Sequence, residues 1–176
     1  MRLTGKVNQR RLIYFQVFGS FIPGYWQVPE ATRAAIDDEG WFRTGDAAYL
    51  DEEGFLFICD RVKDMIITGG ENVYPAEVES GLMRHPAIAE VAVIGAPDAK
   101  WGEAIVAVVV PKPEQSVTLE ELRVFAGEFL ARYKLPTRLE TVPALPRNAT
   151  GKILKYQLRQ TFGRSVEAAA KSAAAS

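Results

Sequence analysis

The chain has 176 residues, of which 48% are hydrophobic and 24% are charged, and its formal net charge at pH 7 is −1. This size and composition are ordinary for one globular domain with some additional segments, and so small a charge gives no electrostatic reason to expect a nucleic-acid or membrane partner. One histidine and one cysteine, Cys59, exclude an internal disulfide and leave too few of the usual ligands for a transition-metal site. We expect a cytoplasmic protein without a membrane span and without a metal ion of its own.

The first 23 residues differ in character from the rest of the chain. They contain Arg2, Lys6, Arg10 and Arg11 and no acidic residue, and a mostly apolar run follows over 12–22. A basic start before an apolar run superficially resembles a signal peptide, but no A-x-A cleavage site follows and the run is too short to span a bilayer. We therefore interpret residues 1–23 as an atypical segment, a non-native or misread start, because nothing in it relates logically to the chain that follows.

From residue 24 onward the apolar pattern becomes regular. The predicted strands share runs rich in β-branched or aromatic residues and cover 55–59, 65–68, 88–95, 104–110 and 138–142. The predicted helices cover 29–36, 75–85 and 155–162, and a further helix carrying apolar residues from Leu119 to Leu130 follows a Thr118–Glu121 capping box. Two acidic clusters that end in glycine, 37–40 and 51–54, predict turns.

These elements indicate a small α+β domain, because strands and helices alternate without a clear parallel repeat. We expect a short hairpin and a small sheet packed with about three helices. The boundaries that we predict place this domain at 61–163, after a separate segment at 24–60. The Ala- and Ser-rich residues 164–176 are expected to form a disordered tail.

Two segments near the middle of the chain carry residues suited to ligand chemistry. We predict a tight turn over 40–46 that presents the Asp46 carboxylate to a ligand with adjacent hydroxyls, the alternative being a plain Gly-Asp turn. Farther on, Arg61 and Lys63 suit phosphate or ribose oxygens, unless they are a solvated surface pair. Gly69-Gly70 would let a ligand approach the backbone closely, unless the two glycines are only a hairpin turn.

Two later segments have similar potential. Trp101 could stack on a purine, although a Trp at a strand boundary is more often a packing residue. The loop 146–152 ends in Gly-Lys, but it is no Walker A loop because Pro146 stands at its start and Ile153 follows the lysine. Lys152 could still place a positive charge on a phosphate or carboxylate, the alternative being an exposed basic loop. His85, at a predicted helix end, is assigned no role.

In their order and spacing these segments resemble the C-terminal part of the adenylate-forming superfamily, which includes acyl- and aryl-CoA synthetases, peptide-synthetase adenylation domains and beetle luciferases. The resemblance covers the chain from about residue 24 to residue 162. Through 69–75, 134–136 and 146–152 it is closest to fatty acyl-CoA synthetases. It implies an acid–thiol ligase that joins a carboxylate to ATP as acyl-AMP and then transfers the acyl group to CoA, with a rotation of the C-terminal domain between the two steps.

The resemblance also implies roles for single residues. Lys152 resembles the adenylation lysine, which stabilises charge developing between carboxylate and α-phosphate. Asp46 would hold the ribose hydroxyls, Arg61 would contact ribose or phosphate, and Lys63 would be the hinge. The CoA and pantetheine path would involve Gly69, Gly70, Trp101 and Lys134. ATP, AMP and CoA would be substrates and products, with no tightly bound cofactor, and Mg²⁺ would be held by the large N-terminal body of the family.

That N-terminal body has little counterpart in the sequence, where only 24–60 resembles a remnant of it. Its phosphate loop, adenine pocket and acyl tunnel are not found, so we expect the chain to be inactive alone and to need an N-terminal synthetase body as its partner. Trp41, Phe42 and Phe55 would then lack the surface on which they pack. Alternatives are a stand-alone CoA-binding or trans-complementing module without turnover, and a purely structural domain. The sequence leaves the acyl chain length open.

Overall fold

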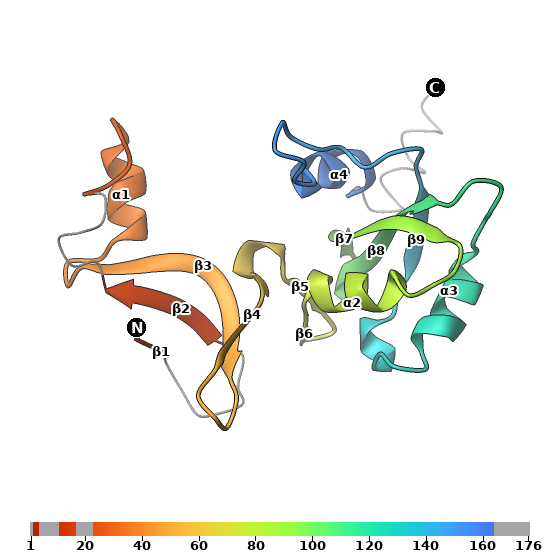
Figure 1. Cartoon of the computed structure of the whole chain (residues 1–176), viewed down its shortest axis with the longest axis horizontal. Helices are drawn as coiled ribbons and strands as arrows, with labels where there is room; N and C mark the ends of the chain where they lie inside the picture. The colour runs from red at the N-terminus through yellow and green to blue at the C-terminus, as the bar shows by residue number, and fades with distance from the viewer. Residues whose placement is uncertain (1, 4–10, 17–22, 164–176) are drawn as a thin grey trace. The chain divides into compact units, whose positions relative to one another are not determined.

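The computed structural model describes residues 2–3, 11–16 and 23–163 (Figure 1). The chain divides into two compact units, Met1–Lys63 and Asp64–Ser176, which we call unit 1 and unit 2. The predicted tail at 164–176 lies outside the described residues, as does much of the segment at 1–23. No helix in the described ranges is long and apolar enough to cross a membrane.

In its described residues, unit 1 is an antiparallel sheet in the order β1-β2-β3-β4 with one short helix. Its elements are β1 (Arg2–Leu3), β2 (Arg11–Gln16), α1 (Pro29–Ala35), β3 (Trp41–Leu50) and β4 (Leu56–Arg61). β2 pairs with β3 from Arg11 opposite Ala48 to Gln16 opposite Trp41. We did not predict a strand in residues 1–23, although the apolar run of this segment is rich in the β-branched and aromatic residues that favour strands.

The two acidic clusters form turns as predicted. The Oδ1 atom of the first aspartate, Asp37 or Asp51, accepts hydrogen bonds from the backbone N–H groups two and four residues later. The glycine that ends each cluster, Gly40 or Gly54, has a φ of 78° or 88°. Glycine adopts this left-handed conformation without the steric penalty of a Cβ, which explains its place in both sequences.

The predicted tight turn over 40–46 is wrong, because β3 begins at Trp41 and includes residues 41–46. Asp46 lies inside the strand, opposite Arg61 of β4. Gly45 has a φ of 73°, so this glycine marks an irregularity within a strand instead of a chain reversal. Of the aromatic residues expected to lack a partner surface, Phe55 is 61% exposed, whereas Trp41 and Phe42 are half-buried.

Unit 2 is built on a five-stranded sheet around the long β7–β8 hairpin. Its strands are β5 (Ile66–Thr68), β6 (Glu71–Val73), β7 (Ile88–Asp98), β8 (Gly102–Pro111) and β9 (Arg138–Thr141). The order is β6-β5-β8-β7; β9 runs parallel to β8, and the other pairs are antiparallel. We did not predict β6, because three residues between a turn and a helix give no visible alternation.

Three α-helices and two 3₁₀ turns complete unit 2. They are η1 (Val62–Asp64), which spans the unit boundary, α2 (Pro75–Leu82), α3 (Leu119–Ala126), η2 (Arg132–Lys134) and α4 (Lys155–Phe162). α2 and α3 end earlier than predicted, although Phe129 and Leu130 still pack on the core beyond α3. Over the described residues, the small α+β fold with four α-helices and two sheets confirms the predicted fold class.

The predicted capping box opens α3. Glu121 N–H donates to Thr118 Oγ1 at 3.2 Å, and Thr118 N–H donates to Glu121 Oε2 at 2.8 Å. The hydrogen bond from the Thr118 N–H, and after it the one that the Thr118 hydroxyl donates to Glu121 Oε2 at 2.8 Å, lower the pKa of the Glu121 carboxyl from its ordinary value of 4.5. A carboxylate that accepts hydrogen bonds is stabilised in its charged form.

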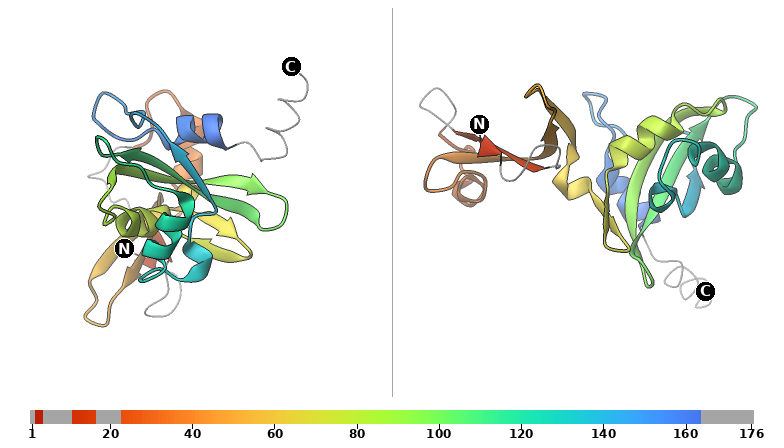
Figure 2. Two further views of the ribbon diagram at one scale, coloured as in Figure 1. Left: turned by 90° about the vertical axis from the view of Figure 1, so that its right-hand side faces the viewer. Right: turned by 90° about the horizontal axis from the view of Figure 1, so that it is seen from below.

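The sheet of unit 2 is covered on both faces, since successive side chains of a strand point to opposite sides. Val91 and Val93 of β7 pack with Leu122 of α3 in one cluster, which also includes Val78 and Leu82 of α2. Ala92 and Ile94 pack with Leu158 of α4 in the second cluster. Figure 2 shows α4 on one side of the β7–β8 pair and α3 on the other. We call these sides the α3 face and the α4 face.

Candidate functional site

Asp46 and Arg61 form an ion pair in unit 1. They are partners across β3 and β4, and Arg61 Nε lies 2.7 Å from Asp46 Oδ1. The backbone N–H of Asp46 donates to Thr44 Oγ1 at 3.0 Å, and that of Arg61 donates to Asp60 Oδ1 at 2.7 Å. The Arg61 side chain is 49% exposed and that of Asp46 22%. A ligand with hydroxyl and phosphate groups would therefore meet a carboxylate and a guanidinium side by side.

Lys63 lies at the boundary between the two units. It is exposed, belongs to the 3₁₀ turn η1, and is the last residue of unit 1, with Asp64 as the first of unit 2. Short 3₁₀ turns are common connectors and often mark hinges. The boundary thus falls directly after the residue for which the resemblance predicts the hinge.

Gly69 and Gly70 form the two-residue turn between β5 and β6, with φ values of 57° and 84°. Positive φ at both central positions is typical of the type I′ hairpin turn. Gly69 has a second constraint, because its N–H donates to the Trp101 carbonyl at 2.8 Å and a Cβ at residue 69 would lie 3.1 Å from Trp101 Cε3. The glycines are therefore a hairpin turn, and the missing side chain at residue 69 also lets the Trp101 indole pack against it.

A cavity of about 510 Å³ opens beside this turn. Its lining consists of Thr68, Gly69, Glu71, Trp101, Ile105, Arg123, Arg132, Tyr133, Leu135 and Thr137. Trp101 and Tyr133 are each about half exposed, so their rings are accessible from the solvent. Aromatic rings beside two guanidinium groups suit a ligand that combines a flat ring with phosphates, and the volume is that of a small-ligand pocket.

Lys134 does not line this cavity. Its ammonium pairs with Glu77 Oε1 of α2, and the side chain is 13% exposed. Its neighbours Arg132 and Tyr133 line the cavity instead, because the three residues per turn of η2 send successive side chains in different directions. Sequence analysis missed these two residues, although a basic and an aromatic residue directly before Lys134 were a usable signal.

The loop before α4 holds the main chain of Lys152 from both sides. It is closed by an isolated β-bridge between Arg147 and Ile153. Asn148 N–H donates to the Lys152 carbonyl at 3.0 Å, and Asn148 Oδ1 accepts from the Lys152 N–H at 2.8 Å. Gly151 takes a φ of 83°, which completes the tight reversal. The Lys152 side chain is exposed, and within the described part of the chain no ion pair holds its ammonium.

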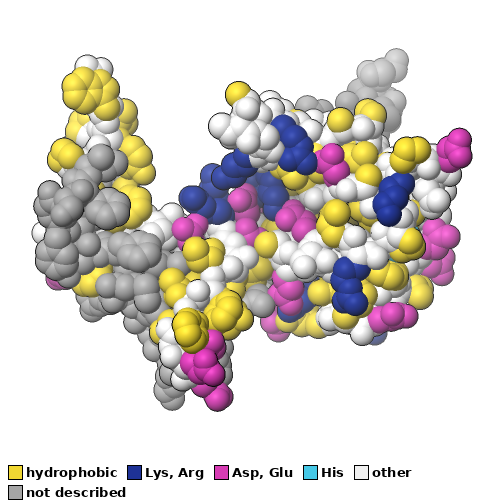
Figure 3. Space-filling view, viewed as in Figure 1, with side chains coloured by type: hydrophobic (Ala, Val, Ile, Leu, Met, Phe, Trp, Pro, Cys, Tyr) yellow, Lys and Arg dark blue, Asp and Glu magenta, His cyan; other side chains and the backbone are white. Residues whose placement is uncertain are grey.

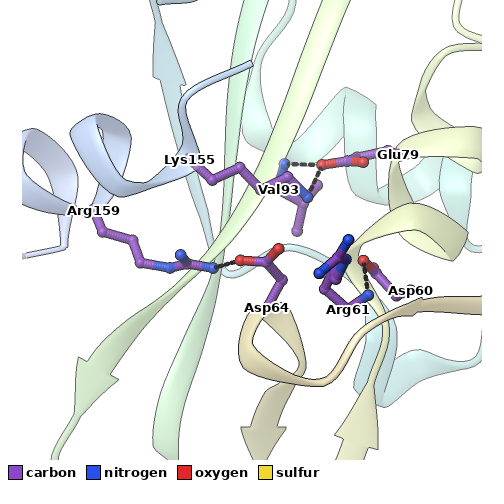
Figure 4. Close-up of polar contacts among 7 residues, drawn as sticks. All are labelled: Asp60, Arg61, Asp64, Glu79, Val93, Lys155 and Arg159. Carbon is purple, nitrogen blue, oxygen red and sulfur yellow. Dashed lines mark hydrogen bonds and ion pairs between the residues drawn. The ribbon is translucent and has the colours of Figure 1, made fainter. Parts of the chain in front are cut away.

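The other cationic side chains of the segment 147–159 are all paired within unit 2. The pairs are Arg147 with Glu90 at 2.5 Å, Lys155 with Glu79 at 2.7 Å, and Arg159 with Asp64 at 2.6 Å. Figure 4 draws the second and third of them. In the space-filling view, Lys and Arg side chains gather around the loop before α4, with Asp and Glu side chains beneath them (Figure 3).

Lys152 and the cavity belong to opposite faces of the unit 2 sheet. Leu145 and Ile153, on either side of the Lys152 loop, pack in the cluster of the α4 face. Ile105, which lines the cavity, belongs to the cluster of the α3 face, and Arg123 comes from α3 itself. No group of three or more His, Cys, Asp or Glu in the described ranges is placed to hold a metal ion. The described part of unit 2 therefore presents the unpaired Lys152 ammonium on the α4 face and an aromatic, basic cavity on the α3 face.

Comparisons with known proteins identify what this arrangement is similar to. Residues 77–152 match the family model of the AMP-binding enzyme C-terminal domain. Long-chain-fatty-acid–CoA ligase FadD13 of Mycobacterium tuberculosis is 54% identical over 142 residues, which are 81% of this chain and 28% of the ligase. Fatty acid–[acyl-carrier-protein] ligase ScoC of Streptomyces coeruleorubidus is 49% identical over 138 residues, 78% of this chain and 26% of that protein.

The fold is also similar to solved structures. The o-succinylbenzoate-CoA synthetase of Bacillus subtilis, in complex with its acyl-adenylate intermediate, matches with a TM-score of 0.80 and 42% identity. The match covers 88% of this chain and 31% of the synthetase. The chain therefore spans less than a third of the length of each of these proteins.

Proposed function

We propose that this chain, which carries the C-terminal domain of the adenylate-forming enzymes, works as the C-terminal part of an acyl-CoA synthetase. In the first step a carboxylate attacks the α-phosphate of ATP, which gives acyl-AMP and releases pyrophosphate. In the second step the thiol of CoA attacks the acyl carbon, which gives the thioester, AMP and a proton. We propose a fatty acid as the carboxylate, because the relative at 54% identity is a long-chain-fatty-acid ligase, and the cytoplasm as the location.

The observation that carries this proposal is the placement of two candidate sites on opposite faces of one small sheet. A domain built in this way can present Lys152 on its α4 face to the substrates of the first step. If the domain rotates between the steps, it can then present the cavity on its α3 face to the substrates of the second step. The boundary between Lys63 and Asp64 is where such a turn would occur, because a few backbone dihedrals at a hinge absorb a large rotation.

For the first step we propose three contacts. The Lys152 ammonium would stabilise the negative charge that develops between carboxylate and α-phosphate, a type of electrostatic effect that often dominates catalysis. Asp46 would accept hydrogen bonds from the ribose hydroxyls, and Arg61, 2.7 Å away from it, would contact ribose or phosphate. Mg²⁺ and the acyl tunnel would belong to the larger part of the synthetase, which the matched relatives have in addition to this chain's counterpart.

For the second step we propose that the cavity receives the nucleotide part of CoA. Trp101 and Tyr133 would contact the adenine ring, while Arg123 and Arg132 would face its phosphates. The Gly69–Gly70 turn would let the pantetheine arm pass close to the backbone. Lys134 would have to leave Glu77 to reach the phosphates.

Two alternatives to this function are a different acceptor for the acyl group and a CoA-binding module that acts alone. One relative is a ligase for acyl carrier protein, so the acceptor thiol could belong to a carrier protein instead of CoA. A stand-alone CoA-binding module finds no support in the comparisons, because the matched relatives are ligases in which the counterpart of this chain is joined to a longer remainder.

The test is a chimera in which this chain replaces the matching C-terminal part of the M. tuberculosis ligase. We expect acyl-CoA formation that depends on ATP, fatty acid and CoA, at a rate well above that of the same ligase without any C-terminal part. A folded chimera with no such excess rate would refute the proposal. Turnover with acyl carrier protein alone would move the acceptor from CoA to the carrier.

A further inference from the structure

The cations of the segment 147–159 show a pattern that the proposed chemistry does not use. Three of them pair with acids from three separate parts of unit 2, namely β7, α2 and η1, whereas the ammonium of Lys152 between them forms no ion pair with any of the described residues. The segment is thus fixed by ion pairs on both sides of Lys152, whose own ammonium has no such pair among the described residues. We infer that Arg147, Lys155 and Arg159 are positioning residues, which lock this segment to unit 2 so that Lys152 is presented at a fixed place.

Arg147 acts closest to Lys152. Its Nη2 lies 2.5 Å from Glu90 Oε2 of β7, and its Nη1 donates to the carbonyl of Gly151 at 2.6 Å. A guanidinium can hold two acceptors at once in a fixed geometry, which an ammonium cannot do. Arg147 therefore ties the residue directly before Lys152 to the edge strand of the sheet.

Lys155 fixes the start of α4. Leu154, at the N-cap position, offers no side-chain cap, and the first turn of the helix contains no acid. A cation at a helix N-terminus is unfavourable, so the pair of Lys155 with Glu79 offsets a local cost. Glu79 Oε1 also accepts from the Val93 N–H of β7 at 2.7 Å, so this carboxylate joins α4 to both α2 and the sheet (Figure 4).

Arg159 joins α4 to the first residue after the predicted hinge. Its Nη2 donates to Asp64 Oδ1 at 2.6 Å, across 95 positions in sequence. Asp64 and the Lys152 segment are therefore held in one unit. If unit 2 turns about the Lys63–Asp64 boundary, this pair makes the segment turn with it.

The exposure of these pairs separates a positioning role from a role in overall stability. The side chains of Arg147 and Glu90 are 42% and 41% exposed, and ion pairs this exposed contribute little to the free energy of unfolding. Breaking the pair should therefore loosen the loop locally and leave the rest of the unit intact.

Limited digestion of the native chain with a protease that cleaves only after lysine tests this inference. Cleavage after Lys152 is compared with cleavage after Lys100 and Lys112, which are also exposed in unit 2. The variants are Arg147→Gln, which removes both contacts, and Glu90→Gln, which weakens only the contact to β7. Arg138→Gln is the matched control, because it breaks the Arg138–Glu140 pair of β9 outside the segment.

We expect Arg147→Gln to speed cleavage after Lys152 by about two- to fivefold, the effect of a partly exposed ion pair on a local opening equilibrium. Glu90→Gln should have a smaller effect in the same direction, and Arg138→Gln none at this site. Cleavage after the two reference lysines should stay unchanged. Equal cleavage after Lys152 in all variants would overturn the inference, and so would a parallel rise at all three lysines, which would indicate a general loss of stability.

The inference rests on the proposed function only for the meaning of Lys152 in catalysis, since digestion needs neither ATP nor a fatty acid. If cleavage shifts as expected while Lys152 proves dispensable in the chimera, the positioning stands and the proposed function fails. If Lys152 is essential in the chimera and cleavage does not shift, the proposed function stands and the positioning role fails.

Discussion

The two faces of the unit 2 sheet arise from the same pair of strands, yet they carry opposite kinds of site. On the α4 face, small side chains such as Ala92 and Ala96 lie under a charged segment, and one lysine is presented on an exposed loop. On the α3 face, larger aliphatic residues form the main core, and the surface beside it opens into an aromatic, basic cavity. The alternation of side chains along β7 and β8 is what allows one hairpin to support both.

This difference has a consequence for how tightly the register of β7 and β8 is specified. A slip of β7 by one residue would exchange its side chains between the faces, which would bring Val91 and Val93 to the α4 face and the smaller Ala92 to the α3 face. The two clusters therefore protect the placement of the two sites as well as the stability of the unit.

The largest expected effect on stability comes from the α3 face. Leu122→Ala should reduce the free energy of unfolding by about 4 kcal/mol, because its side chain is fully buried in the larger cluster and leaves a cavity. Leu158→Ala on the α4 face should reduce the free energy of unfolding by about 3 kcal/mol, because the smaller cluster beneath α4 can relax more easily around the cavity. Chemical denaturation of the two variants measures both values. A smaller loss for Leu122→Ala than for Leu158→Ala would reverse the proposed ranking of the faces.

A smaller effect is expected from a matched pair of glycine variants at the cavity. Gly69→Ala and Gly70→Ala both place a Cβ on a residue with positive φ, so each should lose roughly 1–2 kcal/mol of stability. Only the Cβ at residue 69 would meet the Trp101 ring, at 3.1 Å, since nothing lies within 4 Å of a Cβ at residue 70.

Calorimetric titration of the chain with CoA separates the two variants. The dissociation constant for CoA should be about two- to tenfold higher for Gly69→Ala than for Gly70→Ala. This difference corresponds to the loss of one aromatic contact. Equal affinities would mean that the turn is only a hairpin connection and that the Trp101 ring does not contact CoA.

The smallest effect concerns the capping box of α3. The pKa of Glu121 is lowered in the folded chain, so its carboxylate stabilises the fold above its ordinary pKa of 4.5, and this contribution is lost as the pH falls through the lowered value. Glu121→Gln should therefore be less stable than the parent chain at neutral pH, with a difference that shrinks toward acid pH. Thermal unfolding between neutral and acid pH measures this, with Glu120→Gln as the control from the same turn. A difference that grows toward acid pH would contradict the assignment.

Local signals in the sequence were sufficient for several elements. α4 has the predicted bounds, Lys155–Phe162, and the capping box at Thr118 forms as the motif requires. Both acidic turns also follow from their own residues, since an aspartate side chain and a final glycine define them. Each of these features depends on interactions within about five positions of the chain, which is the range over which sequence patterns are informative.

The errors concern features that depend on distant partners. The first part of β3 was predicted as a turn because Gly45-Asp46 is a turn signal in isolation, whereas pairing with β2 and β4 on either side makes it a strand. The cavity is lined by residues of β5, β8, α3 and η2. Which of Arg132 and Lys134 lines it depends on the direction of η2, which the sequence does not give. The pair of Arg159 with Asp64 spans 95 positions, and no pattern in either segment indicates it.

The central claim, that the two faces serve two different steps, is tested most directly by measuring both steps in the chimera with Lys152→Ala and with Trp101→Ala. Pyrophosphate release reports the first step, and thioester formation from supplied acyl-adenylate reports the second. We predict that Lys152→Ala slows the first step by about 10²- to 10³-fold and leaves the second unchanged. Trp101→Ala should leave the first unchanged and raise the CoA concentration needed for the second by about two- to tenfold. If either variant slows both steps to the same extent, the faces do not divide the reaction and the account is wrong.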